Sequence, residues 1–289
     1  MTVPRGRRSA PRPPAGPATP VRPAATGSRC VSLVQAALAE SRLRTASTVA
    51  HSLLPGQPSV TREQILARLR KLANPKNVEG MARFGINPEN TFGVPVPTLR
   101  SIAKEAGRDH GLAAKLWKSG CHEARIIAPL VDEPARVTEK QMERWVRDFD
   151  SWDICDQCCN NLFRKTEFAH AKAREWTARD EEFVRRAGFV MMAVLAVHDK
   201  KVPDSRFARY LTVIRGGATD ERNFVKKAVN WALRQIGKRN LTLNRKAIDT
   251  AERIATLDSK AARWIAADAL KELRGEKVQE KLRRKAPKQ

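Results

Sequence analysis

The stretch RRAGFVMMAVLAV, residues 185–197, joins two arginines to a continuous run of apolar and small residues. The run is far shorter than the ~20 residues that cross a bilayer, and it predicts a helix buried on all sides. A related junction, Lys226-Lys227-Ala228, opens a second helix 41 residues later. From Thr61 onward, helical periodicity continues with short connectors and no convincing alternation of strand and helix patterns. The sequence therefore predicts an all-α fold.

The spacing of these helices predicts a repeat. The helices containing AVNWALRQI (228–236) and ARWIAADAL (262–270) lie about one further helix pair apart. A drifting period near ~40 residues is typical of stacked helix pairs. We predict a HEAT-like helical-repeat solenoid, a curved α-α superhelix, over residues 59–275. Thr61 and Thr138, each followed by a glutamine three residues later, predict capping boxes, and only RYLTVI (209–214) could be extended.

The two ends of the chain differ from this body. Residues 1–28 hold seven prolines and no acidic residue. Such a segment buries too little apolar surface to offset its ordering entropy, so we expect residues 1–58 to be a disordered Pro/Arg-rich extension. Its composition also resembles an organelle transit peptide, although no amphipathic stripe is evident. Residues 276–289 are expected to form a basic C-terminal tail.

Charge gives the first indication of function. The chain carries 55 Lys+Arg against 31 Asp+Glu, a net charge of +24, and residues 1–58 supply only a small part of it. A strongly basic folded body favours a polyanionic partner, usually nucleic acid. The five cysteines are odd in number and lie in apolar sequence, which indicates a reducing, intracellular setting. We expect the bacterial cytoplasm near the nucleoid, with organelle targeting as the alternative, and no membrane association.

The segment 149–163, FDSWDICDQCCNNLF, combines three cysteines with a Trp-Asp-x-x-x-Asp pattern. On a helical wheel the cysteines share one apolar face with Ile154 and Leu162, so they are interpreted as core and no metal is expected. Trp152 and Asp156 lie one turn apart at the edge of that face. A carboxylate there is either salt-bridged for structure or held for reaction, and neighbouring helices could bring Asp156 to Arg185 or Arg186.

The helix over 222–238 carries a second pattern. Its apolar residues fill one face, and four others share a stripe outside it: Lys227, Trp231, Arg234 and Lys238. Three cations beside an exposed aromatic side chain suit contact with a phosphate backbone and its sugars. A solvated basic face with one stray tryptophan is the alternative.

Four motifs in order resemble the DNA alkylation repair enzymes of the AlkD-like type, which are HEAT-like-repeat DNA glycosylases. They are FGVPVPTLRSIAKE (92–105), SWDICDQ (151–157), VRRAGFVMM (184–192) and VKKAVNWALRQIGKRN (225–240). The resemblance covers about Thr61 to Arg274. The extension before Thr61 is foreign to the family pattern.

This resemblance implies metal- and cofactor-free hydrolysis of the N-glycosidic bond of 3- or 7-alkylated purines in double-stranded DNA, by a monomer. By position, Asp156, Trp152 and Arg186 match the family's catalytic residues, and Trp231 matches an aromatic residue at the lesion. Arg185 adjoins Arg186, so one residue of alignment decides between the two arginines. Two alternatives remain: a non-catalytic HEAT-like protein that binds or senses damaged DNA, and a scaffold for a protein partner.

Overall fold

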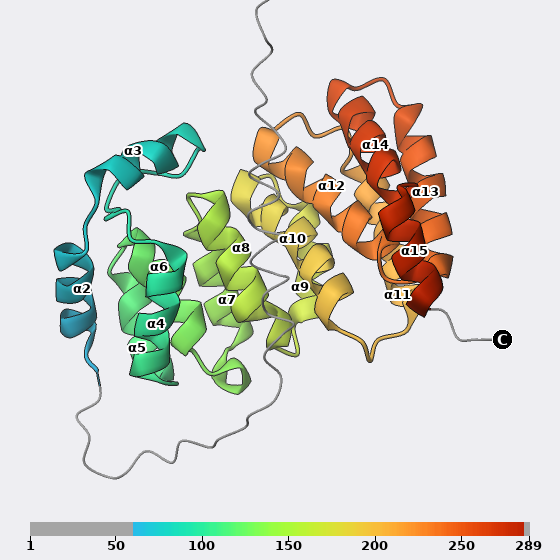
Figure 1. Cartoon of the computed structure of the whole chain (residues 1–289). Coiled ribbons are helices and arrows are strands. Elements are labelled where there is room, and N and C mark those ends of the chain that lie inside the picture. Colours follow the sequence, from blue (N-terminus) through green and yellow to red (C-terminus); the bar gives the residue numbers. More distant parts are fainter. Residues whose placement is uncertain (1–59, 286–289) are drawn as a thin grey trace, which may run out of the picture. The chain divides into compact units, whose positions relative to one another are not determined.

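The computed structural model describes residues 60–285. Every regular element in this range is helical, with fourteen α-helices and three short 3-10 helices (Figure 1). The all-α HEAT-like prediction is confirmed. No helix in the described range is both long and apolar enough to cross a membrane. The predicted extension, residues 1–58, lies outside the described residues.

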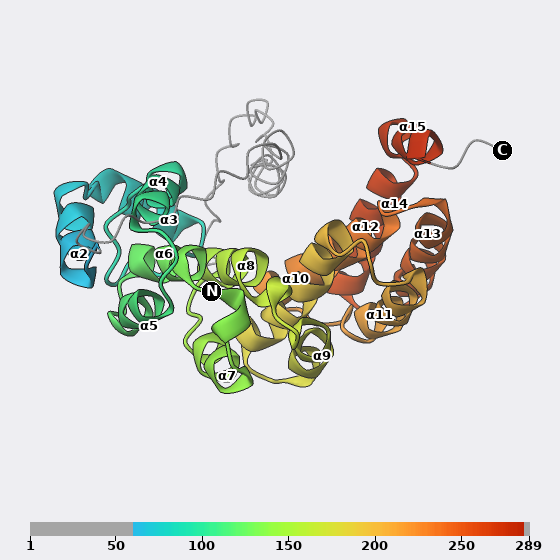
Figure 2. The ribbon, with the colours of Figure 1, turned by 90° about the horizontal axis from the view of Figure 1, so that it is seen from below.

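Most helices of residues 60–285 form two rows, which Figure 2 shows side by side. Consecutive members of the first row pack on one another. The first row consists of α4 (Val96–Ala106), α6 (His122–Val131), α8 (Trp152–Asn161), α10 (Glu182–His198), α12 (Asn223–Gly237) and α14 (Lys260–Leu273). The second row flanks it and consists of α5 (His110–Lys118), α7 (Glu139–Arg147), α9 (Ala169–Glu175), α11 (Asp204–Gly216) and α13 (Leu241–Ala255).

The remaining elements lie at the ends of the rows or in the connectors. They are α2 (Arg62–Lys71), α3 (Pro75–Arg83), α15 (Glu276–Lys285) and the 3-10 helices Pro134–Arg136, Phe163–Lys165 and Trp176–Ala178. RYLTVI lies within α11 and is helical, because Tyr210, Leu211 and Ile214 form the buried face of that helix. The segment expected to be a basic tail forms α15 over most of its length, and Leu282 is buried. This apolar anchor gives α15 a packed face.

Local sequence signals start several helices. Thr61 and Gln64 form the complete capping box that the sequence predicts. At Thr138 only half of the box forms. The threonine accepts a hydrogen bond from the Gln141 amide, but the Gln141 side chain donates to Asp132 instead. A tertiary partner therefore replaces the local one.

Helix α10 is the core of the unit, with twelve of its seventeen residues buried, so the apolar run is a buried helix as predicted. Gly188 allows α10 to approach the Trp176–Ala178 turn closely. A Cβ atom added at Gly188 would lie 2.6 Å from the backbone nitrogen of Thr177, closer than packed atoms can come. Only glycine fits this crossing without a shift of the backbone. The crossing lies half a turn from Arg186 and therefore bears on the position of that side chain.

Candidate active site

Asp156 of α8 and Arg186 of α10 form a buried ion pair. Oδ1 of Asp156 accepts hydrogen bonds from Nε and Nη2 of Arg186 at 3.1 and 2.8 Å, and Oδ2 accepts one from Nη2 at 2.9 Å. The residues are only 6% and 5% exposed. Nη1 of the same arginine donates to the Phe224 carbonyl of α12 at 2.6 Å. One guanidinium thus joins three consecutive helices of the first row.

Burial and the mutual attraction of the two charges shift the pKa values of both groups in the pair. Burial raises the pKa of the Asp156 carboxyl to about 6, while the charge and hydrogen bonds of Arg186 act in the opposite direction. Burial also disfavours the charged form of Arg186, but the charge and hydrogen bonds of Asp156, with smaller influences from Cys155 and Cys159, together outweigh burial and raise the pKa of the guanidinium. Asp156 is therefore an anion at neutral pH and takes up a proton in mild acid.

Aromatic side chains surround the outer edge of this pair. Trp152 begins α8, is half-buried, and donates from Nε1 to the Phe84 carbonyl at 3.1 Å. The Phe84 ring itself is largely exposed. Phe224 stacks on Phe183 with ring centroids 5.5 Å apart, and Gly85 packs directly against the Phe224 ring. The turn after α3 therefore contacts both α8 and α12 beside Asp156.

The cysteines of α8 belong to the core. Cys155, Cys158 and Cys159 have no exposed surface, as the helical wheel predicts. Burial raises the pKa of the Cys158 and Cys159 thiols well above the usual range, so these groups are protonated. Within residues 60–285, no cluster of three or more His, Cys, Asp or Glu side chains has a metal-binding arrangement. The cysteines contribute packing to this site.

The stripe predicted on the helix over 222–238 is not an exposed surface. Trp231 is 7% exposed, and its Nε1 is buried without a hydrogen-bond partner in the described protein. Arg234 is buried and contacts Glu272 and Asp268 of α14 at 2.6 and 3.2 Å, while Lys238 contacts Glu272 at 2.6 Å. The expectation of an exposed aromatic among free cations is therefore wrong, because α14 covers this part of α12 and supplies the counter-charges.

Two other predicted DNA-binding residues differ in their surroundings. Lys227 is partly exposed and pairs with no carboxylate in the described part of the chain, so it remains available to an anion. Arg185 points away from Asp156 and lies 3.4 Å from Asp220, which also binds Arg222. Of the two adjacent arginines, the structure brings only Arg186 to Asp156.

Sequence reasoning missed the interactions that hold α8 and the preceding loop. His122 of α6 is buried and its Nε2 lies 2.9 Å from Oδ2 of Asp153. Burial lowers the pKa of His122, but the hydrogen bond and charge of Asp153 outweigh burial and raise it. The buried Glu123 carboxylate accepts hydrogen bonds from the amides of Phe92, Gly93 and Val94. In the sequence, only the adjacent His122 and Glu123 at the start of a helix indicate that polar side chains are held here.

Comparison with known proteins decides the family. A family model described as "DNA alkylation repair enzyme" matches residues 65–273, which is well over half of the chain. The chain belongs to the DNA alkylation repair enzyme family. The match spans α4 to α14, and with them Trp152, Asp156 and Arg186. The family assignment supports a role in DNA repair or DNA binding.

The individual relatives are distant. Uncharacterized proteins of Listeria monocytogenes serovar 1/2a and Listeria innocua serovar 6a are each 21% identical over 199 residues, covering 68% of this chain and 87% of the relative. One solved structure has a TM-score of 0.63 at 19% identity and covers 72% of this chain and 94% of its own. That protein is described as one of a new family related to the HEAT-like repeat DNA glycosylases, with affinity for branched DNA structures. At this identity the match confirms the fold.

Proposed function

We propose that this member of the DNA alkylation repair enzyme family is a DNA glycosylase that hydrolyses the N-glycosidic bond of cationic 3- or 7-alkylated purines in duplex DNA. One observation carries the proposal: an anionic Asp156, held by Arg186, lies beside Trp152 at the start of α8. A carboxylate with two oriented oxygens can stabilise a sugar that becomes positively charged as its bond to the base breaks. The substrate class is the one that the resemblance to the AlkD-like glycosylases implies.

A cationic alkylpurine is already a good leaving group, so the base needs no general acid. Asp156 would place negative charge beside the developing oxocarbenium ion and orient the attacking water. Trp152 would pack its half-buried ring against the deoxyribose. The proposed chemistry uses side chains of this chain alone, and we propose that the monomer performs it.

The contacts of Arg186 favour a role at the carboxylate over contact with a DNA phosphate. All of its hydrogen bonds in the structure go to Asp156 and to the Phe224 carbonyl. We therefore propose that Arg186 keeps Asp156 ionised and oriented inside an apolar site. It is a positioning residue, and its positive charge lowers a pKa that burial alone would raise further.

The test is release of free 7-methylguanine from methylated duplex DNA by the full chain. Wild-type protein should release the base in buffer containing a chelator, and Asp156→Asn should release it at least ~10²-fold more slowly. Wild-type protein that binds methylated duplex yet releases no base would refute the catalytic proposal. A matched control is Glu272→Gln, which removes a carboxylate from the other buried arginine of the first row.

A binding function without hydrolysis is the second candidate, and one observation favours it. Arg186 holds both oxygens of Asp156, so the carboxylate has little exposed surface for a sugar or a water. The relative with affinity for branched DNA structures has the same fold. Under this candidate the protein would bind branched DNA more tightly than linear duplex, and Asp156→Asn would leave that preference unchanged.

A further inference from the structure

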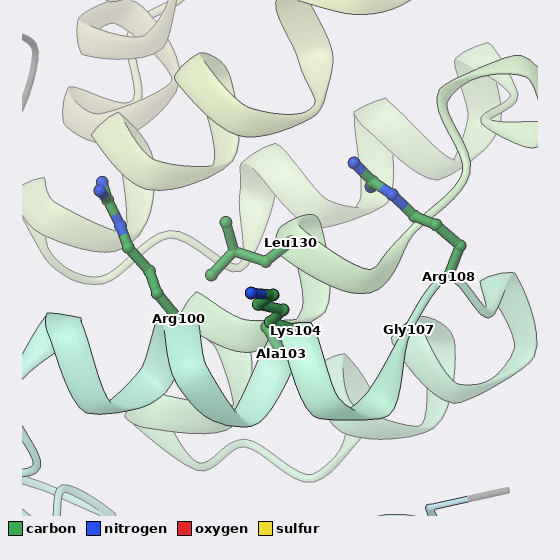
Figure 3. A pocket seen from close by; sticks show the side chains of 6 residues that line it. All are labelled: Arg100, Ala103, Lys104, Gly107, Arg108 and Leu130. Atoms are coloured by element: carbon green, nitrogen blue, oxygen red, sulfur yellow. The ribbon is translucent and has the colours of Figure 1, made fainter. Parts of the chain in front are cut away.

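A pocket of about 310 Å³ lies between α4 and α6, away from the Asp156–Arg186 pair. Its lining includes three cations, Arg100, Lys104 and Arg108, together with Leu130 at its floor (Figure 3). Arg100 and Arg108 stand on either side of the opening and Lys104 lies between them. Arg100 and Lys104 lie one turn apart on α4, about 6 Å along the helix, and Arg108 continues this row just after Gly107, which ends the helix.

These charges are not neutralised by the protein. No carboxylate in the described range pairs with Arg100, Lys104 or Arg108. The nearby acidic residues have other partners: Glu105 binds Arg68, Asp109 accepts a hydrogen bond from the Leu112 amide, and Asp132 binds His110 and Gln141. Arg108 donates one hydrogen bond, to the backbone carbonyl of Asp132. The row therefore presents uncompensated positive charge around a hollow.

The helix dipole explains the positions of only some of these three cations. Cations near a helix C-terminus are favoured by the helix dipole, so Lys104 and Arg108 need no ligand to explain them. Arg100 lies in the middle of α4, and its Nε is buried with no hydrogen-bond partner in the protein. The helix dipole therefore does not account for Arg100, whose charge has no counter-charge among the described residues.

A second group of cations continues the surface toward α8. Lys165, in the turn after α8, is exposed and has no carboxylate partner in residues 60–285. Although part of the side chain is exposed, partial burial of the ammonium, and then the charges of Arg164 and Arg108, lower the pKa of Lys165 to about 8. Arg108 and Lys165 follow the C-terminal ends of α4 and α8, whereas Trp152 begins α8, about 15 Å away along that helix.

We propose that the pocket lined by Arg100, Lys104 and Arg108 binds a backbone phosphate of duplex DNA on the segment beside the lesion. The assignment of DNA as the ligand rests on the proposed function. A phosphate in the pocket would pair with the charges of Arg100 and Lys104, which no carboxylate of the described residues neutralises, and the row would contact neighbouring phosphates. This contact positions the duplex and reads no base. It extends the DNA-binding surface away from α12, where the predicted stripe is covered.

The experiment compares salt dependence for two double variants of the full chain. Arg100→Gln/Lys104→Gln should reduce the slope of log K against log salt for an undamaged duplex by about two units. Lys115→Gln/Lys118→Gln removes the same charge from exposed positions of α5 in the second row and should leave the slope near that of wild type. Arg100→Lys/Lys104→Arg keeps both charges and should retain most of the slope.

Two results of the salt series would overturn the proposal: equal slopes for the two Gln double variants, or a wild-type slope for Arg100→Gln/Lys104→Gln. A third result would come from chemical shifts measured with inorganic phosphate. The proposal fails if Arg100→Gln/Lys104→Gln abolishes the phosphate-induced shift changes while its salt slope for DNA binding stays at the wild-type value. The last result would identify a site for free phosphate. Thermal melting of each variant verifies folding. Because undamaged duplex reports binding alone, absence of base release would refute the proposed function without affecting this outcome.

Discussion

Arg186 and Arg234 are both buried arginines of the first row, yet their partners place them in different environments. Arg186 contacts a single carboxylate that is as buried as itself. Arg234 contacts Glu272 and Asp268, both partly exposed, and Glu272 also pairs with Lys238. One site is an isolated charge pair removed from water, and the other is a network in contact with solvent.

This difference supports the proposal that one site is reactive and the other structural. Water and alternative cations can compensate a change in the Arg234 network, whereas within residues 60–285 the Asp156–Arg186 pair has only the Phe224 carbonyl as a further polar partner. Electrostatic interactions are also stronger where water is excluded. Under the proposed function, the chemistry that needs a fixed negative charge is assigned to Asp156, and the carboxylates of α14 hold two helices together.

The largest expected effect is on stability. Arg186→Met leaves the Asp156 anion buried without a partner, and the free energy of unfolding at pH 7.5 should fall by about 3–5 kcal/mol. Urea denaturation of wild type and variant measures this change. Arg186→Met/Asp156→Asn removes both charges and should recover most of the loss. A loss below ~1 kcal/mol for the single variant would contradict the burial of the pair.

The next effect concerns rate. Asp156→Asn keeps the shape of the side chain but removes its charge, and should slow base release by ~10²-fold or more, or about 2.7 kcal/mol of transition-state stabilisation. Single-turnover release of 7-methylguanine measures it. Glu272→Gln is the matched change in the Arg234 network and should keep the wild-type rate. Equal slowing by the two variants would remove the distinction between the sites.

A fall in pH should affect Asp156 but not the Arg234 network. The pKa of Asp156 is raised to about 6, so the active anion predominates above that pH and is lost as the pH falls through it. Base release should decline by up to tenfold per pH unit below about 6. The pKa of Glu272 is lowered, since Arg234 and Lys238 outweigh burial, and its network stays ionised over this range. A rate that is level from pH 7 to pH 5 would exclude Asp156 as the required anion.

Replacement of the second arginine should have a smaller effect. Arg234→Gln leaves Glu272 paired with Lys238 and partly hydrated, so the free energy of unfolding should fall by only about 1 kcal/mol. The salt dependence of DNA binding should not change, because the Arg234 charge is already neutralised. Denaturation and binding titrations test both points. A salt slope lowered by a full unit would show that Arg234 leaves its carboxylates to contact DNA.

The smallest effect is expected at Lys227, the member of the predicted stripe that lacks a carboxylate partner in the described residues. Lys227→Ala should flatten the salt slope by about one unit and leave melting unchanged. The measurement is the affinity for undamaged duplex across a salt series, with Lys246→Ala on α13 as the control. An unchanged slope would show that this part of α12 does not face DNA.

The sequence was sufficient for the fold and for Asp156, but not for the choice between Arg185 and Arg186 as its partner or for the environment of α12. Helical periodicity and spacing predict stacked helices because each helix needs one apolar face, and the motifs single out Asp156 together with the two adjacent arginines. The wheel placed Trp231 and Arg234 outside the apolar face of their own helix. It could not show that α14 covers them, because Glu272 and Asp268 lie more than thirty residues away. Periodicity describes a helix and not its neighbours.

Gly188 has a consequence for the evolution of this site. It bears no reactive group and lies on α10 two residues after Arg186, where a methyl group would collide with the backbone at Thr177. Any larger residue would displace α10 and, with it, the guanidinium from Asp156. Relatives that retain the acid and the arginine should therefore also retain glycine here. Lineages that lose the chemistry are free to substitute all three, so covariation of these positions would record where in the family the activity was kept.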